Sequence, residues 1–170
     1  MAGALLLSDV GGGGSIDALR GNTVAVAECF DSLFEQTLLV GGAPPSDWPG
    51  DRVADPRGAE GELHSMVSAW EAATAERVLI ADAEAAGACA DLLLALTAWP
   101  ERDLVVVTEG GDETALCSLY RTSGCLALAQ RLLGEGQASS GAFMEAIRQK
   151  GEVREVAASE LGLADWRGAH

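Results

Sequence analysis

Two patterns of apolar residues alternate along the chain. Short, continuous apolar runs that end at glycine, proline or polar residues are typical of buried strands. Longer segments with apolar residues three or four positions apart are typical of amphipathic helices. The first pattern predicts strands at residues 4–7, 37–40, 52–54, 77–81, 104–108, 115–120 and 153–156.

The second pattern is clearest where Leu63, Met66, Val67 and Trp70 recur at helical spacing. Because Trp70 shares this stripe, we predict that it is a core residue and not an exposed platform for a base. Further helices are predicted at residues 21–34, 85–96 and 124–133, the last with Gly134 just past its end. Another begins after a Ser139 or Ser140 cap, and residues 157–170 form a tail.

The alternation of strands and helices predicts an α/β fold with a largely parallel central sheet. We expect the strands at residues 4, 37, 77 and 104 to build its centre. A chain of 170 residues without an evident repeat or linker suits one domain, residues 1–170. Ligands of such sheets bind at the carboxyl ends of the strands.

A glycine cluster follows the first predicted strand at Gly11, Gly12, Gly13 and Gly14. Glycine allows a sharp turn and a close approach to a ligand, and successive N–H groups can form a concavity that binds anions. The pattern therefore predicts a nucleotide-binding loop. Its immediate neighbourhood has no lysine, because Lys150 is the only lysine of the chain.

Two aspartates follow predicted strands at the same expected edge. Asp82 comes directly after a buried strand, where a carboxylate could hold Mg²⁺ between phosphates or could cap the next helix. Asp55 could accept hydrogen bonds from a base or ribose, although an Asx-turn before Pro56 is the commoner role. Arg20, Arg57 and Arg121 are the cations that we expect nearest to this edge.

Net charge, cysteine spacing and hydrophobicity argue against several classes of partner and site. The net charge of −15 argues against nucleic acid and anionic membranes as partners, and it repels free polyphosphates unless Mg²⁺ screens them. The four cysteines have no zinc-ligand or CxxC spacing, which predicts buried, reduced thiols. No apolar run is long enough to span a bilayer, and no basic region precedes the first leucines, so we expect a cytoplasmic protein.

Several segments resemble the MobA-like nucleotidyltransferases, the molybdenum cofactor guanylyltransferase family, over roughly residues 4–156. Asp55 and the helix start that follows it are similar to the family's Asp and its Gly-Pro-Leu-x-Gly. Residues 78–82, Val-Leu-Ile-Ala-Asp, are similar to its strand ending in Cys-Asp-Met-Pro. Residues 114–121, Thr-Ala-Leu-Cys-Ser-Leu-Tyr-Arg, are similar to its Pro-Leu-x-x-x-Tyr-Arg strand, and Gly21-Asn-Thr23 to the Gly-Lys-Pro that opens its first long helix.

The resemblance implies a three-layer, Rossmann-like fold of the nucleotide-diphospho-sugar-transferase type. It implies that Asp82 binds Mg²⁺, that Asp55 contacts the nucleotide, and that Ser8 and the four glycines belong to the phosphate loop. The substrates would be an NTP, GTP or CTP, and a phosphorylated acceptor such as molybdopterin. The loop departs from the family pattern, because residues 7–10 read Leu-Ser-Asp-Val in place of Leu-Ala-Gly-Gly and the family's loop Arg and Lys are missing.

These features support two main functions. Asp55 and Asp82 favour a divergent nucleotidyltransferase. The acidic Asp9 and the missing lysine favour a non-catalytic relative that binds or regulates a protein partner. A third alternative is a transferase of the same fold with a different activated substrate. The loop predicts weak NTP binding and slow or absent transfer.

Overall fold

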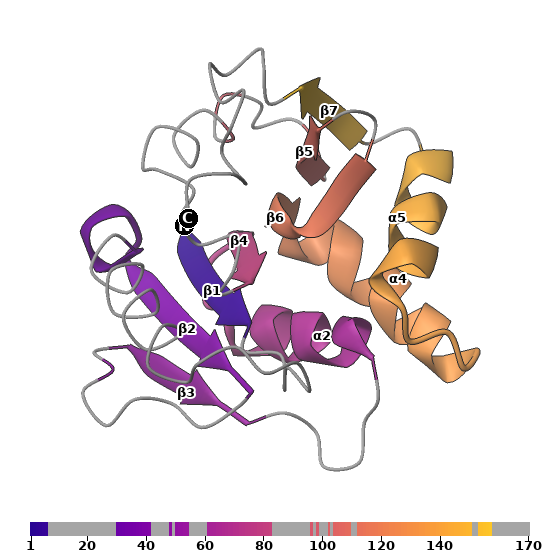
Figure 1. Cartoon of the computed structure of the whole chain (residues 1–170). Coiled ribbons are helices and arrows are strands. Elements are labelled where there is room, and N and C mark those ends of the chain that lie inside the picture. Colours follow the sequence, from indigo (N-terminus) through magenta and orange to yellow (C-terminus); the bar gives the residue numbers. More distant parts are fainter. Residues whose placement is uncertain are drawn as a thin grey trace, which may run out of the picture.

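The computed structural model describes residues 1–6, 30–41, 48, 50–54, 61–82, 96, 98, 102, 104–109, 112–150 and 153–157. Within these residues seven strands form one sheet (Figure 1). The strands are β1 (Ala2–Leu6), β2 (Gln36–Val40), β3 (Asp51–Val53), β4 (Arg77–Asp82), β5 (Leu104–Glu109), β6 (Asp112–Arg121) and β7 (Val153–Ala157). Each overlaps a strand predicted from the sequence.

The strand order is β3-β2-β1-β4-β6-β5-β7. Strands β1 to β4 are parallel to one another, and β7 is parallel to β5. Only β6 among the described strands runs against its neighbours, β4 and β5. The predicted, mostly parallel α/β sheet is therefore confirmed. The predicted centre is correct for β2, β1 and β4, but β6 separates β4 from β5.

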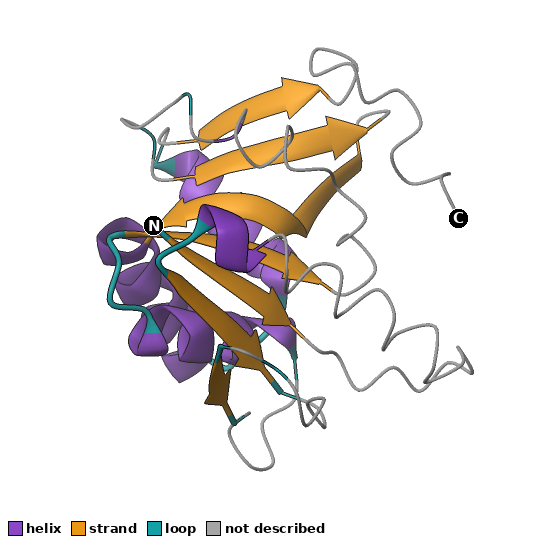
Figure 2. Cartoon of the chain, turned by 90° about the vertical axis from the view of Figure 1, so that its left-hand side faces the viewer, coloured by secondary structure: helices purple, strands orange, loops and turns teal. Residues whose placement is uncertain are grey.

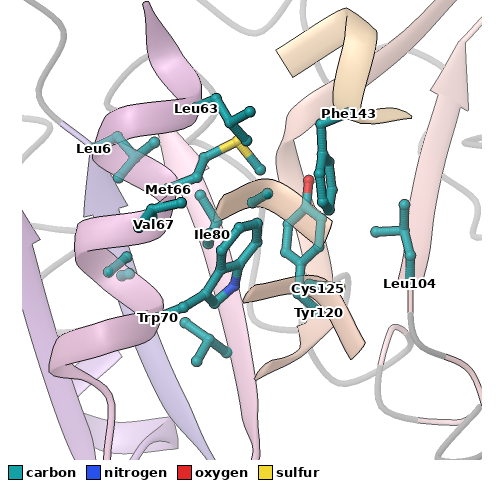
Figure 3. Close-up of a cluster of buried hydrophobic side chains, with 14 of the residues drawn as sticks. Leu6, Leu63, Met66, Val67, Trp70, Ile80, Leu104, Tyr120, Cys125 and Phe143 are labelled. Carbon is teal, nitrogen blue, oxygen red and sulfur yellow. The ribbon is translucent and has the colours of Figure 1, made fainter. Parts of the chain in front are cut away.

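Helices α2 (Glu62–Ala72), α4 (Thr122–Gly134) and α5 (Ser140–Gln149) lie together on one face of the sheet (Figure 1). Figure 2 shows the sheet with these helices from the side. The predicted stripe of α2 is buried, and Trp70 is only 1% exposed. Its ring meets Tyr120 edge-on at a centroid distance of 5.3 Å and Phe143 at 5.4 Å (Figure 3). The prediction that Trp70 is a core residue is confirmed.

The other face of the sheet is also covered. Leu39, Leu79, Val105 and Leu119 alternate with the strand residues that face α2, α4 and α5, and each is at most 1% exposed. Burial on both faces explains why the strands read as continuous apolar runs. The fold is thus the expected three-layer, Rossmann-like arrangement.

The described part of this second layer is small. Residues 30–33 are helical, and the rings of Phe30 and Phe34 lie so close to β1 that a Cβ on Gly3 would come within 2.6 Å of Phe34. The rest of the helix predicted at residues 21–34 lies outside the described residues. So does the helix predicted at residues 85–96, apart from buried Leu96, and so does the tail after Ala157, which itself ends β7.

Helix α4 ends one residue later than predicted, and Gly134 is not the glycine that terminates it. The helix continues through Gly134, and Gly136, at a φ of 78°, ends it. The N–H of Gln137 donates to the carbonyl of Leu132 at 2.9 Å, and that of Gly136 donates to Leu133 at 3.0 Å. This is a Schellman motif, which requires the left-handed residue after the helix and not within it. The predicted serine cap of α5 is confirmed, because the N–H of Ala142 donates to Ser139 Oγ at 3.1 Å.

One packing contact gives a stability prediction. Gly50 lies so close to β2 that a Cβ would overlap the carbonyl oxygen of Thr37 and come within 3.0 Å of Trp48 Nε1. We expect Gly50→Ala to lower the free energy of unfolding by about 1–3 kcal/mol, measured by urea denaturation. Gly134→Ala is the control, because nothing lies within 4 Å of a Cβ there and alanine favours helices. Equal stability of the two variants would contradict the prediction.

Candidate functional site

The carboxyl ends of the first four strands lie side by side at one edge of the sheet. Leu6, the last residue of β1, pairs with Asp82, the last residue of β4. On its other side Leu6 pairs with Val40 of β2, which in turn pairs with Val53 of β3. We call this row, from Val53 to Asp82, the carboxyl edge. It is the part of a parallel α/β sheet where ligands usually bind.

The pairing of β1 with β4 places the end of β1, after which the glycine segment follows, next to Asp82. Ser8 is two residues beyond Leu6 in the sequence, so the chain leaves β1 toward Ser8 and the glycines from the position beside Asp82. Residues 7–29, and with them Ser8, Gly11, Gly12, Gly13 and Gly14, lie outside the described residues. Their role in binding phosphates therefore stays a prediction.

Asp55 also lies outside the described residues, two positions beyond Val53. Three strand spacings, about 14 Å in all, separate the end of β3 from the end of β4. A ligand that engages residues following both strands must therefore be elongated, as a nucleotide is. For Asp82 the structure gives the backbone position at the end of β4, and both interpretations of its carboxylate stay open.

Strands β5 and β6 bring further acidic residues to the same edge, which were not predicted from the sequence. Glu109, the last residue of β5, pairs with Asp112, the first of β6, and Thr108 pairs with Glu113. The sequence signal is the Gly-Gly pair between Glu109 and Asp112, which is typical of a tight turn between two strands. The carboxyl edge thus continues past β4 to β6 and β5, and at this edge β4, β6 and β5 carry the acidic residues Asp82, Asp112 and Glu109.

The pairing of β5 with β6 is irregular near this edge. Val106 pairs with Ser118, but Thr108 pairs with Glu113, so residues 114–117 of β6 stand opposite Val107 alone. An excess of residues on one strand is a bulge, and bulges bend a strand and are frequent beside active sites. The irregularity falls in the part of β6 that resembles the family's Pro-Leu-x-x-x-Tyr-Arg strand.

Arg121 does not reach this edge, and the sequence expectation was wrong. It pairs with Arg77 at the beginning of β4, the opposite end of that strand from Asp82. Its Nε lies 3.9 Å from a carboxylate oxygen of Glu76. The error has a physical cause: β6 runs antiparallel to β4, so the end of β6 lies at the amino end of the parallel strands. Arg20 and Arg57 lie outside the described residues.

The first turn of α2 also lies at the carboxyl edge. Leu63, near the start of the helix, and Leu6 lie at the same end of the cluster in Figure 3, with Trp70 at the other. A free helix amino end can bind an anion through its N–H groups. Here the Leu63 N–H donates to the carbonyl of Ala138 at 3.2 Å, and the His64 N–H donates to Gly61 at 3.2 Å. Both groups are thus already used within the protein.

Three further observations concern metal, thiols and membranes. No group of three His, Cys, Asp or Glu side chains that could hold a metal occurs within the described ranges. Cys125 is buried, as expected, and Cys117 lies in β6, whereas Cys29 and Cys89 fall outside the described residues. In the described part of the chain no helix has the length and apolar character needed to cross a membrane.

Solved structures share this fold. Molybdopterin-guanine dinucleotide biosynthesis protein A (MobA) from Archaeoglobus fulgidus superposes with a TM-score of 0.69 at 15% identity, over 95% of this chain and 85% of that one. The 2-C-methyl-D-erythritol 4-phosphate cytidylyltransferase from Thermus thermophilus gives 0.65 at 16% identity, over 95% of each chain. Rv0371C from Mycobacterium tuberculosis, solved as a manganese complex, gives 0.60 at 16% identity, over 92% and 86%.

At the sequence level, no protein-family model and no curated protein matches this chain. The structural neighbours therefore establish the fold: this chain shares the mostly parallel, three-layer α/β architecture of MobA and of the cytidylyltransferase, as the resemblance of its motifs implied. A divalent metal is present in one of these neighbours.

Proposed function

We propose that this chain, residues 1–170 acting as one domain, is a divergent, cytoplasmic nucleotidyltransferase of the MobA-like type. The observation that carries the proposal is the pairing of Leu6 with Asp82. Because of this pairing, the segment with the glycines follows β1 from a position beside Asp82. This is the edge at which parallel α/β sheets usually bind ligands. The MobA and cytidylyltransferase neighbours, with the same fold, support it.

In the proposed reaction an NTP, GTP or CTP, reacts with a phosphorylated acceptor such as molybdopterin. A phosphate oxygen of the acceptor forms a bond to the α-phosphorus, the bond from that phosphorus to the β-phosphate oxygen breaks, and pyrophosphate leaves. The chain would bind phosphates through the N–H groups of Ser8 and the glycines, and would contact the nucleoside through Asp55. These contacts align the reacting atoms.

Mg²⁺ fits the end of β4. One or two carboxylates together with substrate phosphates are the usual ligands of this ion, and Asp82 offers a carboxylate at the last position of a strand next to the predicted phosphate loop. Bound there, Mg²⁺ would neutralise phosphate charge. Because most of its ligands would come from the nucleotide, we expect the metal to bind together with the nucleotide.

A specific observation also favours a second function, a non-catalytic relative of the same fold that binds or regulates a protein partner. The segment from Ser8 to Ser15 has no Lys or Arg, and it includes the anionic Asp9. Among the described strands, the residues that the register places at the carboxyl edge of β4, β5 and β6 are acidic: Asp82, Glu109 and Asp112.

Calorimetric titration with GTP, CTP and ATP in the presence of Mg²⁺ or Mn²⁺ tests the site. We expect millimolar affinity for GTP or CTP in the wild type and at least a tenfold loss in Asp82→Asn, because the variant lacks the metal's carboxylate. Glu76→Gln is the control, since Glu76 precedes β4 at the opposite end of the strand. Equal metal-dependent affinity of wild type and Asp82→Asn would assign Asp82 to helix capping.

A further inference from the structure

The amino end of α2 is fixed by the connection between α4 and α5, which lies far along the chain. Gly61 precedes α2 with a φ of 104°, a conformation that glycine adopts without strain. The carbonyl oxygen of Ala138 lies 2.5 Å from where a Cβ on Gly61 would be, and it accepts the N–H of Leu63 at 3.2 Å. Only glycine at position 61 allows this approach.

A side-chain contact reinforces this anchor. The hydroxyl of Ser140, the first residue of α5, donates to the carboxylate of Glu62 in the first turn of α2. A hydrogen bond to a charged acceptor is stronger than one between neutral groups. The backbone and side-chain contacts together join α2 to the α4–α5 connection at a single place.

The connection is itself held on both sides. The Schellman motif at Gly136 ends α4 just before it, and Ser139 caps α5 just after it. Helices α4 and α5 pack against each other and against α2 (Figure 1). The carbonyl of Ala138 is therefore presented to α2 by a fixed piece of backbone.

The anchored turn lies toward the same end of the core as the candidate site. Leu63 and Leu6 share one end of the core cluster in Figure 3, and Leu6 pairs with Asp82 at the carboxyl edge. We propose that Ser140, acting through Glu62, and Gly61 are positioning residues: they fix the first turn of α2 relative to the ends of β1 and β4, and so set nucleotide affinity without touching the nucleotide. This inference rests on the proposed function.

The test compares two contacts that hold opposite ends of α2. Ser140→Ala removes the hydroxyl that binds Glu62, whereas Gln130→Ala removes a side-chain bond of 2.9 Å to Glu71 near the other end of the helix. We expect Ser140→Ala to weaken the binding of GTP with Mn²⁺ about fivefold, the effect of one hydrogen bond. We expect Gln130→Ala to leave the affinity unchanged, and Ser140→Thr, which keeps a hydroxyl, to restore it.

Hydrogen exchange of the Leu63 amide gives a readout that needs no nucleotide. It should accelerate about fivefold in Ser140→Ala and stay at the wild-type rate in Gln130→Ala. If the wild type binds no nucleotide, the proposed function fails, and the exchange rate alone still decides whether Ser140 holds this turn. Unchanged exchange in Ser140→Ala overturns the inference. So does faster exchange combined with wild-type affinity, because the contact would then hold the helix without positioning the site.

Discussion

Replacing Trp70 by alanine is expected to lower the free energy of unfolding by about 3–5 kcal/mol. Its side chain is almost fully buried between the sheet and the helices, and its ring packs against Tyr120 and Phe143. These two rings also lie 6.1 Å apart, so the three aromatic residues form one cluster. Alanine would leave a cavity where α2, α5 and β6 meet. A urea denaturation curve measures the loss.

The variant Trp70→Phe distinguishes the effect of the lost side-chain volume from that of the unpaired indole N–H. Trp70 Nε1 is buried and has no hydrogen-bond partner among the described residues. An unpaired buried donor costs free energy, so removing it offsets part of the volume lost in phenylalanine. We expect Trp70→Phe to cost less than about 1.5 kcal/mol. A denaturation midpoint for Trp70→Ala equal to that of the wild type would contradict the buried position.

Nucleotidyl transfer by this chain is expected to be slow or absent, at least about three decades in rate below an enzyme with a complete phosphate clamp. Preorganised cations stabilise the charge on the phosphates in the transition state, and the segment from Ser8 to Ser15 offers N–H groups without a cation. Asp9 adds repulsion within that segment, and the net charge of −15 acts in the same direction. Pyrophosphate release with GTP or CTP and molybdopterin as acceptor measures the rate.

Supplying the missing charge should improve the site. We expect Asp9→Lys to tighten GTP binding with Mg²⁺ about tenfold, because a charge-assisted contact replaces a repulsion. Glu35→Lys makes the same change in net charge at the other end of β1, where Glu35 lies 3.5 Å from the N-terminal amine, and should have little effect. Rapid turnover of the wild type would overturn the expectation. It would mean that Arg20, Arg57 or a partner subunit supplies the cation.

The strands and the core helix α2 could be predicted because burial requires a characteristic pattern of apolar residues within each segment. Leu38 to Val40 and Val78 to Ala81 are apolar without interruption since both faces of the sheet are covered. The stripe that contains Trp70 has the helical period, and Ser139 carries the preference of a cap. Each of these signals depends on a few neighbouring residues.

Features that depend on pairing between distant segments could not be predicted in this way. The sequence of β6 does not indicate that this strand runs antiparallel to β4. Because it does, Arg121 lies at the amino ends of the parallel strands, beside Arg77. The Gln36 side chain, which accepts the N–H of Thr74 at 2.9 Å and donates to Asp51 at 3.1 Å, reads in the sequence as an ordinary polar residue. The capping of Leu63 by Ala138 is equally invisible.

The candidate site was predictable in position more than in detail. A polar residue after a buried strand predicts the carboxyl edge, and the register confirms that Asp82 ends β4 beside the strand that leads to the glycines. Glu109 was missed although it directly follows the strand predicted at residues 104–108, whereas the place of Asp112 depends on the antiparallel pairing of β6 with β5. The contacts of Ser8, the glycines and Asp55 with a nucleotide stay predictions.

The central claim is that a nucleotide and a divalent cation bind at the carboxyl edge, between the ends of β1 and β4. Paramagnetic broadening by Mn²⁺ in the presence of millimolar GTP tests it directly, because it detects weak binding and locates it. We predict stronger broadening of the amide signals of Leu6 and Asp82 than of Ala2 and Arg77, which lie about 13 Å or more away along the same strands. The difference should vanish in Asp82→Asn. Equal broadening at both ends of these strands, or none, would contradict the account.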